Sequence, residues 1–532
     1  MAFTAFSQKP KAVVAPTPNK PKLVVGIVVD QMRYDYLYRY AEKYSSGGFK
    51  RLMNEGFNCK NNHYHYAITT TGPGHAAVYT GSSPAINGIV GNEWYDPLSN
   101  RQVYVVEDST VTGVGADAGT AGQMSPKNMH TSTITDQLRL SNDFKSKVVV
   151  VAIKDRGAIL PAGHTANAAY WFDTKTGNWI SSTYYMKDLP QWAKDFNAQK
   201  MPDKILAQKW EPLLPLSQYT ESEGDNQPYE NSLPEEKEPV FPHTLNSYYA
   251  LPTSPFGNTM TKEFALAALR SENMGKGEAT DFLCVSFSST DYIGHSFGTH
   301  AVEMEDCYLR LDRDIEDLLK NLDLQVGKGN YLVFLTADHG VADVPDFLKK
   351  HKIPAGVADG SKDSKFLNSQ IEAAFGEGKW IKAANNYQLY LDHDLMKKKK
   401  VSFAQIHEIL KDNLLTLGSP VQDVLNLHDM SNAVIPDYYR SLINNVYNPK
   451  LSGDFFTILE PAWFYGYKKG TTHGTMYAYD THVPLLFYGW KITPGETVER
   501  THIADIAPTV AALLNILEPN GTIGKPIPTV CR

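Results

Sequence analysis

Three short apolar runs in this chain each lead to an aspartate, and this repetition constrains the fold more than any other feature. The runs occupy residues 22–29, 282–287 and 331–335, and they lead to Asp30, Asp291 and Asp338. Short runs rich in β-branched residues are typical of buried parallel strands. Open α/β sheets bind their ligands beyond the carboxyl ends of such strands. The sequence therefore predicts three carboxylates that converge at one edge of a mostly parallel sheet.

Two histidines accompany these aspartates, since His295 lies four residues after Asp291 and His339 follows Asp338 directly. Zinc accepts both imidazole and carboxylate ligands. Two such ions about 3.5–4 Å apart can clamp the attacking and leaving oxygens of a phosphoryl transfer. A single aspartate after a strand is more often a turn or cap residue. The prediction of a dinuclear metal site therefore depends on the repetition.

A late histidine would complete the predicted ligand set. His473 is the best candidate because it lies in a tight loop between two glycines, at residues 470–474. His482 is the second candidate, but it comes just before a predicted strand at residues 483–488, which favours a structural role or a role beside the ligands. His63 and His65 alternate on a predicted strand, and we expect them to be structural.

Residues 69–79 read as a loop that enters a helix, with Pro73 in the first turn. Thr71 would then lie at the helix N-terminus, where the dipole and the free N–H groups favour an anion. A metal ion at its hydroxyl would make an alkoxide nucleophile available. The alternative is that Thr71 only caps the helix.

Three further residues have the chemistry of an anion clamp. Lys154 and Arg156 are two residues apart on a segment that we expect to be extended, so both side chains would point to one face and Asp155 away from it. Arginine can bind two phosphoryl oxygens at once, while lysine supplies a point charge. Asn92 is a candidate donor to a third oxygen, or else a turn residue after a glycine.

The alternation of strand and helix patterns divides the 532 residues into one composite α/β domain with two insertions. Periodicity predicts an amphipathic helix at residues 303–323, and we also expect helices at 49–55 and 503–514. We expect core segments at residues 22–164, 257–341 and 461–532, a cap insertion at 165–256 that packs over the sheet edge, and a second insertion at 342–460. Residues 1–21 are predicted to be a flexible N-terminal segment that resembles a signal-peptide remnant. A periplasmic or secreted location is therefore expected, and the alternative is a frayed cytoplasmic N-terminus.

Composition excludes some classes of function. The net charge of −7 gives nucleic-acid binding no electrostatic support, and the basic run at residues 397–400 reads as a solvated helix face. The sequence contains no run of about 18 apolar residues, so no transmembrane helix is predicted. The four cysteines are scattered and show no CxxC spacing, which argues against a thiolate zinc site.

At these residues the chain resembles the alkaline phosphatase superfamily, and most closely the PafA-type, phosphate-insensitive periplasmic alkaline phosphatases of Bacteroidetes. The resemblance runs from residue 22 to the C-terminus and includes the segments VVGIVVDQMRYDYLYRY, TGSSPAINGIVGNEWYD, KDRGAILPAGH, STDYIGHSFG and GNYLVFLTADHG. One departure is TGPGH at residues 71–75, where relatives often carry T-x-I-G-H. The resemblance implies an alkaline-phosphatase-like sandwich, with helices on both faces of the sheet.

The resemblance also implies a mechanism. One zinc ion would be held by Asp291, His295 and His473, and a second by Asp30, Asp338 and His339 together with Thr71. Thr71 would attack phosphorus to form a phosphothreonine, which water would hydrolyse. Lys154, Arg156 and Asn92 match the phosphoryl-binding residues of the family. An additional structural ion such as Ca²⁺ stays open, and a monomer that acts on small phosphate monoesters is expected.

The chief alternative is a phosphodiesterase or nucleotide pyrophosphatase, which shares the metal ligands. The pair Lys154 and Arg156 favours monoesters, because a monoester dianion carries one more charge than a diester. A sulfatase would need a Cys/Ser-x-Pro-x-Arg motif, and residues 71–75 lack both the Cys/Ser and the Arg. A phosphoglycerate mutase relative would carry a serine nucleophile and prefer manganese. A non-catalytic phosphate-binding protein would be expected to have lost a ligand or the nucleophile, and none is missing.

Overall fold

A ten-stranded sheet forms the centre of the computed structural model, which describes residues 19–531 except 118, 417 and 467. Its strands run in the order β20 (Gly495–His502), β2 (Phe57–His63), β19 (Leu485–Gly489), β12 (Tyr331–Thr336), β1 (Leu23–Val29), β11 (Asp281–Phe287), β6 (Val148–Ala152), β7 (Ala168–Asp173), β8 (Asn178–Ser182) and β5 (Gly113–Val114). The block from β12 to β7 is parallel throughout. The predicted mostly parallel α/β sheet is confirmed.

The three apolar runs of the sequence form β1, β11 and β12, and every residue of these strands is buried. Strand β1 lies between the other two and pairs with both in parallel. At its carboxyl end Val29 pairs with Phe287, and Val28 pairs with Thr336. The chain therefore leaves all three strands at the same edge of the sheet.

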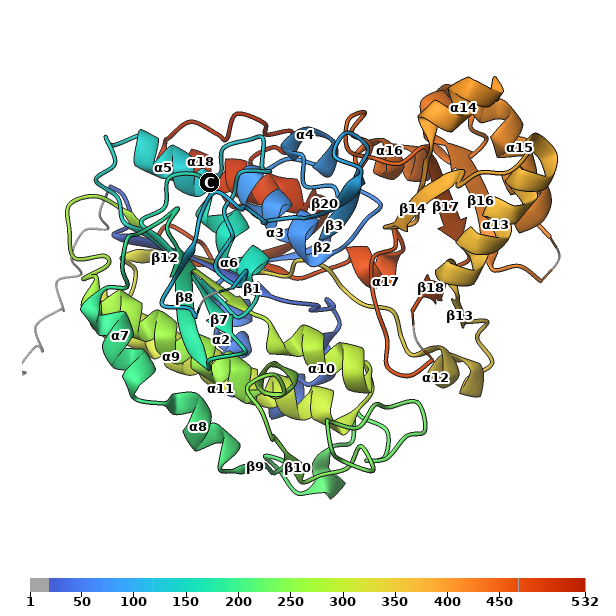
Figure 1. Ribbon diagram of the computed structural model, residues 1–532. Helices are drawn as coiled ribbons and strands as arrows, with labels where there is room; N and C mark the ends of the chain where they lie inside the picture. Colours follow the sequence, from blue (N-terminus) through green and yellow to red (C-terminus); the bar gives the residue numbers. More distant parts are fainter. Residues whose placement is uncertain (1–18, 118, 417, 467, 532) are drawn as a thin grey trace, which may run out of the picture.

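Helices cover both faces of the sheet, as predicted (Figure 1). One face carries α3 (Thr71–Thr80), α5 (Ile134–Leu140), α6 (Asp155–Ala162) and α18 (Ile506–Leu514), and the other carries α7 (Gln191–Ala198), α9 (Phe256–Ser271) and α11 (Val302–Gln325). The predicted helices at 49–55 and 303–323 correspond to α2 (Phe49–Glu55) and α11. Leu311, Ile315 and Leu318 are fully buried on the inner face of α11. The core thus lies between the helical layers and the sheet.

The predicted cap insertion at residues 165–256 is partly wrong. Strands β7 and β8 belong to the large sheet, where β7 extends the parallel block beside β6. Their sequences are rich in aromatic residues, such as Tyr170, Trp171 and Trp179, and all three are buried. Aromatic side chains favour strands as well as caps. The part of this segment that lies outside the sheet begins only after β8.

The second insertion forms a lobe of its own, drawn in orange at the right of Figure 1. We call residues 356–465 the inserted lobe. Its four-stranded sheet has the order β14 (Ile381–Asn385), β15 (Gln388–Leu391), β17 (Phe455–Leu459) and β16 (Val421–Asn426). Helices α13 (Gly360–Phe375), α14 (His393–Lys399) and α15 (Phe403–Leu414) enclose a separate hydrophobic core with it. Strand β18 (Trp463–Tyr465) pairs with β13 (Gly356–Ala358), so the lobe extends slightly past the predicted boundary at 460.

The predicted N-terminal segment lies outside the described residues except for residues 19–21. Within the part of the chain that the structure describes, no helix combines the length and the hydropathy that crossing a bilayer requires.

Candidate active site

The three predicted aspartates lie together at the carboxyl ends of the central strands. Asp30 follows β1 directly, Asp291 lies in the first turn of α10 (Ser289–Phe297) after β11, and Asp338 lies two residues after β12. All three are at least 97% buried. Gln31 joins two of them, because its backbone N–H donates to Asp338 Oδ1 at 3.1 Å and its side-chain amide donates to Asp291 Oδ1 at 2.8 Å.

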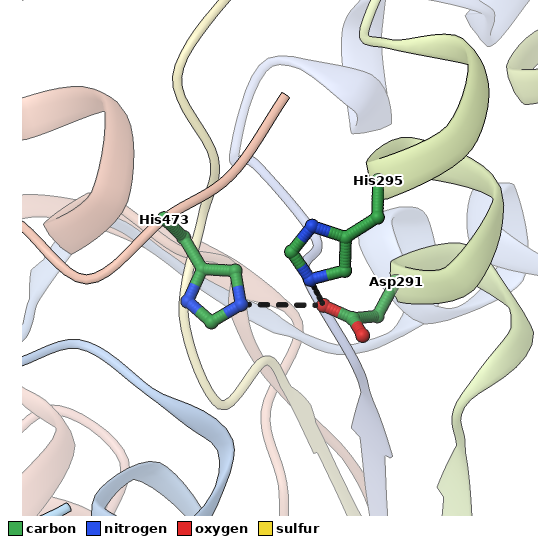
Figure 2. Close-up of side chains that lie close together, drawn as sticks. All are labelled: Asp291, His295 and His473. Carbon is green, nitrogen blue, oxygen red and sulfur yellow. Dashed lines mark ion pairs between the residues drawn. The ribbon is translucent and has the colours of Figure 1, made fainter. Parts of the chain in front are cut away.

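Asp291, His295 and His473 form one group of potential metal ligands (Figure 2). The Nε2 atoms of His295 and His473 lie 3.2 and 3.4 Å from Asp291 Oδ1. The Nδ1 atom of His295 donates to the Thr471 carbonyl at 2.8 Å, and that of His473 donates to the Thr69 carbonyl at 2.7 Å. These backbone bonds fix both tautomers, so each Nε2 presents a lone pair toward the group, as metal-binding histidines do.

His482 lies elsewhere, in agreement with the structural role that its position favoured. Its Nε2 faces the Lys60 carbonyl at 2.9 Å, and its ring stacks between His63 and Tyr34. His473 instead reaches the aspartates because Gly470 turns the chain with a φ of +70°. A side chain on Gly470 would meet the His295 carbonyl oxygen at 1.8 Å. The close approach of these two loops therefore requires glycine.

Asp30, Asp338 and His339 surround a second position. His339 Nε2 lies 3.5 Å from Asp30 Oδ1 and 3.5 Å from Asp338 Oδ2. Asp291 also offers a ligand atom within 4.8 Å of Asp30 and His339, so it borders both positions.

The polar atoms at this second position lack partners. Asp30 Oδ1, Asp338 Oδ2 and His339 Nε2 are buried and have no hydrogen-bond partner among the described residues. Leaving such atoms unpaired costs about 1–3 kcal/mol each. A cation fits this donor set, since it would satisfy all three.

Two of the candidate ligands already have the protonation states that metal binding requires. Burial lowers the pKa of His339 to about 3, so its imidazole is neutral. Burial by itself would raise the pKa of Asp291, but His295 and Lys154 hold it well below its usual range. Burial and the neighbouring Asp338 raise the pKa of Asp30. Metal ligands must be neutral imidazoles and ionised carboxylates. Asp291 and His339 already have these forms at neutral pH.

Thr71 is the first residue of α3, and Thr70 occupies the N-cap position. Thr71 Oγ1 lies 3.4 Å from Lys154 Nζ. The structure therefore contradicts the alternative that Thr71 serves as the cap. Gly74 allows α3 to approach this closely, because a side chain there would meet the Asp338 carbonyl oxygen at 2.1 Å.

Asn92 and His75 hold the start of α3 in place. The Gly72 N–H donates to Asn92 Oδ1 at 2.7 Å, which directs the amide nitrogen of Asn92 to other acceptors. His75 Nδ1 donates to the Thr71 carbonyl at 2.9 Å, and its Nε2 accepts from Ser286 Oγ at 2.8 Å. Thr71 is thus held by hydrogen bonds at its own carbonyl group and at the N–H group of the next residue, Gly72.

The expectation of an extended segment through Lys154 and Arg156 is wrong in one respect. Lys154 is extended, but it is the N-cap of α6, and Arg156 already lies in the first helical turn. Residues two apart in a helix do not share a face, so the side chains of Lys154 and Arg156 start from different backbone conformations. Arg156 donates to the Tyr104 hydroxyl at 3.1 Å.

Lys154 carries its charge into the middle of the aspartates. Its Nζ lies 2.7 Å from Asp30 Oδ2 and 2.5 Å from Asp291 Oδ2. Its ammonium group also lies 5.2 Å from the centre of the Tyr292 ring. Burial alone would lower the pKa of Lys154, but Asp291 and Asp30 raise it above its usual value, so the side chain stays charged.

Sequence reasoning missed the roles of Gln31, His75, Tyr104 and Tyr292. Gln31 adopts a φ of +63°, a conformation that nothing in the sequence signals for glutamine. The tyrosines lie on other elements and contact the cations only in the folded chain.

A cavity of about 630 Å³ lies between the site and the inserted lobe. Thr70 and His473 line it from the site, and Asn386, Tyr387 and Lys365 line it from the lobe. Asn386 also donates to the Glu93 carbonyl at 2.7 Å, which ties the lobe to the strand that follows Asn92.

Comparisons with known proteins give a consistent family. The model of the family described as Type I phosphodiesterase / nucleotide pyrophosphatase matches residues 24–483. A protein named calcium-transporting ATPase from Myroides odoratus is 49% identical and covers 96% of this chain and 94% of its own. Alkaline phosphatase PhoV from Synechococcus elongatus is 48% identical, over 98% of this chain and 96% of its own. Alkaline phosphatase PafA from Elizabethkingia meningoseptica is 47% identical, over 96% and 94%.

Two crystal structures of alkaline phosphatase PafA match this chain. The wild-type structure has a TM-score of 0.94 at 46% identity and covers 98% of this chain and 100% of that one. The second, at 45% identity and a TM-score of 0.93 over 97% and 100%, carries a threonine-to-serine substitution and changes of an asparagine, a lysine and an arginine to alanine. The four changed positions are 21, 62 and 2 residues apart, as are Thr71, Asn92, Lys154 and Arg156 here.

Proposed function

The chain belongs to the PafA- and PhoV-like alkaline phosphatases within the Type I phosphodiesterase / nucleotide pyrophosphatase family, and we propose that it hydrolyses phosphate monoesters at a two-zinc centre through a phosphothreonine at Thr71. The observation that carries the proposal is the position of Lys154, whose ammonium group approaches Thr71 Oγ1, Asp30 and Asp291 together.

The proposed ligands divide into two sets, with Asp291, His295 and His473 for one ion. Asp30, Asp338 and His339 hold the other. When bound, the ions lower the pKa of the nucleophile and stabilise charge on the attacking and leaving oxygens. The unpartnered buried atoms of Asp30, Asp338 and His339 support this division.

Thr71 Oγ1 loses its proton to solvent and attacks phosphorus, the bond from phosphorus to the leaving oxygen breaks, and the phosphoryl group is carried on the threonine. The leaving oxygen takes up a proton from solvent. Water then attacks the same phosphorus, which releases inorganic phosphate and regenerates the hydroxyl group. Lys154, Arg156 and the amide nitrogen of Asn92 bind the non-bridging oxygens. The helix dipole of α3 favours the same negative charge.

Monoesters are the proposed substrates because Lys154 and Arg156 both stay charged. Burial alone would lower the pKa of Arg156, but Tyr104 and Asp155 raise it above its usual value. The family description favours a diesterase as the second candidate. A diester has one charge fewer and esterifies the oxygen that these cations would bind. The terminal phosphate of ATP carries the same charge as a monoester, so ATP turnover is compatible with the proposed site.

The test is Thr71→Ala, with Thr71→Ser as the matched variant. We expect Thr71→Ala to retain bound metal and phosphate affinity, but to turn over an aryl phosphate at least about 10³-fold more slowly, because the nucleophile is gone. Acid quenching during turnover should trap a phosphorylated peptide from residues 69–80 in the wild type and in Thr71→Ser, but not in Thr71→Ala. Full activity of Thr71→Ala, with unchanged metal content, would remove Thr71 from the mechanism.

A further inference from the structure

The inserted lobe contains a third group of metal-type ligands, which the proposed reaction does not use. His393 Nε2 lies 2.8 Å from Asp454 Oδ1, and His428 Nε2 lies 2.7 Å from the same oxygen. One ligand atom from each residue falls within 4.8 Å of the other two. We propose that His393, His428 and Asp454, the lobe triad, bind a divalent transition-metal ion, with Zn²⁺ the best match to these donors.

Asp454 is held rigidly by the sheet of the lobe. It directly precedes β17 and is 95% buried. Its backbone N–H donates to the Leu389 carbonyl at 2.8 Å, and its Oδ2 accepts from the Leu391 N–H at 2.7 Å. These two bonds to β15 fix the carboxylate and leave Oδ1 directed at the histidines. A ligand that is already oriented loses little conformational freedom when it binds an ion.

The two histidines come from separate elements. His393 is the first residue of α14, and His428 lies in the 3₁₀ segment η4 (Leu427–Asn432). Phe403 at the start of α15 stacks on His428 with ring centres 4.1 Å apart and meets His393 edge-on at 5.4 Å. The side chains of His393 and His428 are 55% and 35% exposed. Phe403 thus forms an apolar wall behind the rings, while solvent reaches the remaining coordination positions.

The donor set and its spacing support a metal ion. Two imidazoles and one carboxylate are the protein ligands of several zinc sites that keep an open position. In a tetrahedral site with zinc–ligand bonds of about 2.0–2.1 Å, the ligand atoms are about 3.3 Å apart. The distances of 2.7 and 2.8 Å must therefore grow by about half an ångström, which the two surface rings allow. Two hydrogen bonds to a single carboxylate oxygen are the competing explanation.

The lobe triad should bind metal more weakly than the active site does. His295, His339 and His473 each direct Nδ1 to a backbone carbonyl. Within the described residues, neither His393 nor His428 has such a partner at Nδ1. Losing these outer contacts typically lowers metal affinity 10–100-fold.

An ion at the lobe triad would tie α14, η4 and the β15–β17 pair together. The other end of β15 follows Asn386 and Tyr387, which line the cavity beside His473. Because β15 is only four residues long, the ion would brace the wall of the cavity from behind. It would contact no substrate.

The experiment compares the wild type, the double variant His393→Gln/His428→Gln and the control His351→Gln, which removes an exposed histidine elsewhere. Each protein is equilibrated with micromolar ZnCl₂ at pH 7.5, freed of unbound metal and analysed for zinc per chain. We expect the wild type and the control to hold one zinc ion more than the double variant, while aryl phosphate turnover stays within about twofold in all three. Equal zinc content in all three would overturn the proposal and leave the hydrogen-bonded triad.

A single variant keeps the test decisive if the double variant fails to fold. His393→Gln changes only the more exposed ring. Zinc titration of this variant should show the weakest wild-type binding step shifted by tenfold or more, with the tighter steps unchanged. Unchanged affinity at every step would refute metal binding by the lobe triad.

Discussion

Lys154 offers the sharpest perturbation of the proposed mechanism. Its side chain is only 2% exposed and lies 2.5 and 2.7 Å from two carboxylate oxygens. At an effective dielectric constant of about 20, a charge about 4 Å away interacts by about 4 kcal/mol. Replacing Lys154 by methionine keeps the volume and removes this charge. Monoester kcat/KM should fall by about 10²–10³-fold, in line with the loss of one strong transition-state donor.

The same substitution should affect a diester less. A diester carries one negative charge fewer, so its interaction with Lys154 is about half as strong as that of a monoester. Losing this weaker interaction should lower the diester kcat/KM by about 10–30-fold. The preference for monoesters therefore drops by about tenfold or more. Matched p-nitrophenyl phosphate and methyl p-nitrophenyl phosphate are the substrates, with metal content measured on each sample.

The control is Lys262→Met. Lys262 is also buried, with Nζ 2.7 Å from Asp317 Oδ2 and 2.7 Å from Glu263 Oε1, but it lies on α9 away from the site. It should lose stability without changing the substrate preference. Equal losses on both substrates in Lys154→Met would mean that Lys154 only organises the carboxylates, and the reasoning would be refuted.

Two further predictions concern packing and pH. Gly74→Ala forces a methyl group to within 2.1 Å of the Asp338 carbonyl oxygen, so it should lower the free energy of unfolding by about 1–3 kcal/mol and lower activity. The control is Gly277→Ala, where the nearest neighbour of the added methyl group is 4.0 Å away, and it should change neither. Urea unfolding and rate assays measure both effects. Burial lowers the pKa of His65 to about 3, and neither ring nitrogen has a described hydrogen-bond partner. The unfolded chain takes up this proton near pH 6.5, so the stability contribution is complete above pH 6.5 and is lost as pH falls toward 3. Between pH 7 and pH 4, the free energy of unfolding of His65→Leu should therefore fall by up to about 3 kcal/mol less than that of the wild type. An unchanged acid sensitivity would contradict the assignment.

The sequence predicts the sheet and the convergence of the aspartates well, because both follow from local patterns. Apolar runs with no polar interruption made β1, β11 and β12 recognisable, and parallel pairing then fixes which ends coincide. His473 was recognisable from its flanking glycines, although 182 residues separate it from Asp291.

The errors arise where tertiary contacts decide. The segment at Lys154 looked extended, but α6 begins one residue later, because the helix packs on β6 and α3. The aromatic residues of β7 and β8 read as a cap, yet they extend the sheet. Gln31 has a left-handed backbone conformation that only its bonds to Asp291 and Asp338 account for.

The most direct test of the proposed function is the ratio of kcat/KM for a monoester and a methyl diester with the same aryl leaving group, measured on one metal-analysed sample. The positions of Lys154, Arg156 and Asn92 predict that the monoester is preferred by at least about 10³-fold, because each cation recognises charge that the diester lacks. A ratio near or below one would contradict the account and favour the diesterase.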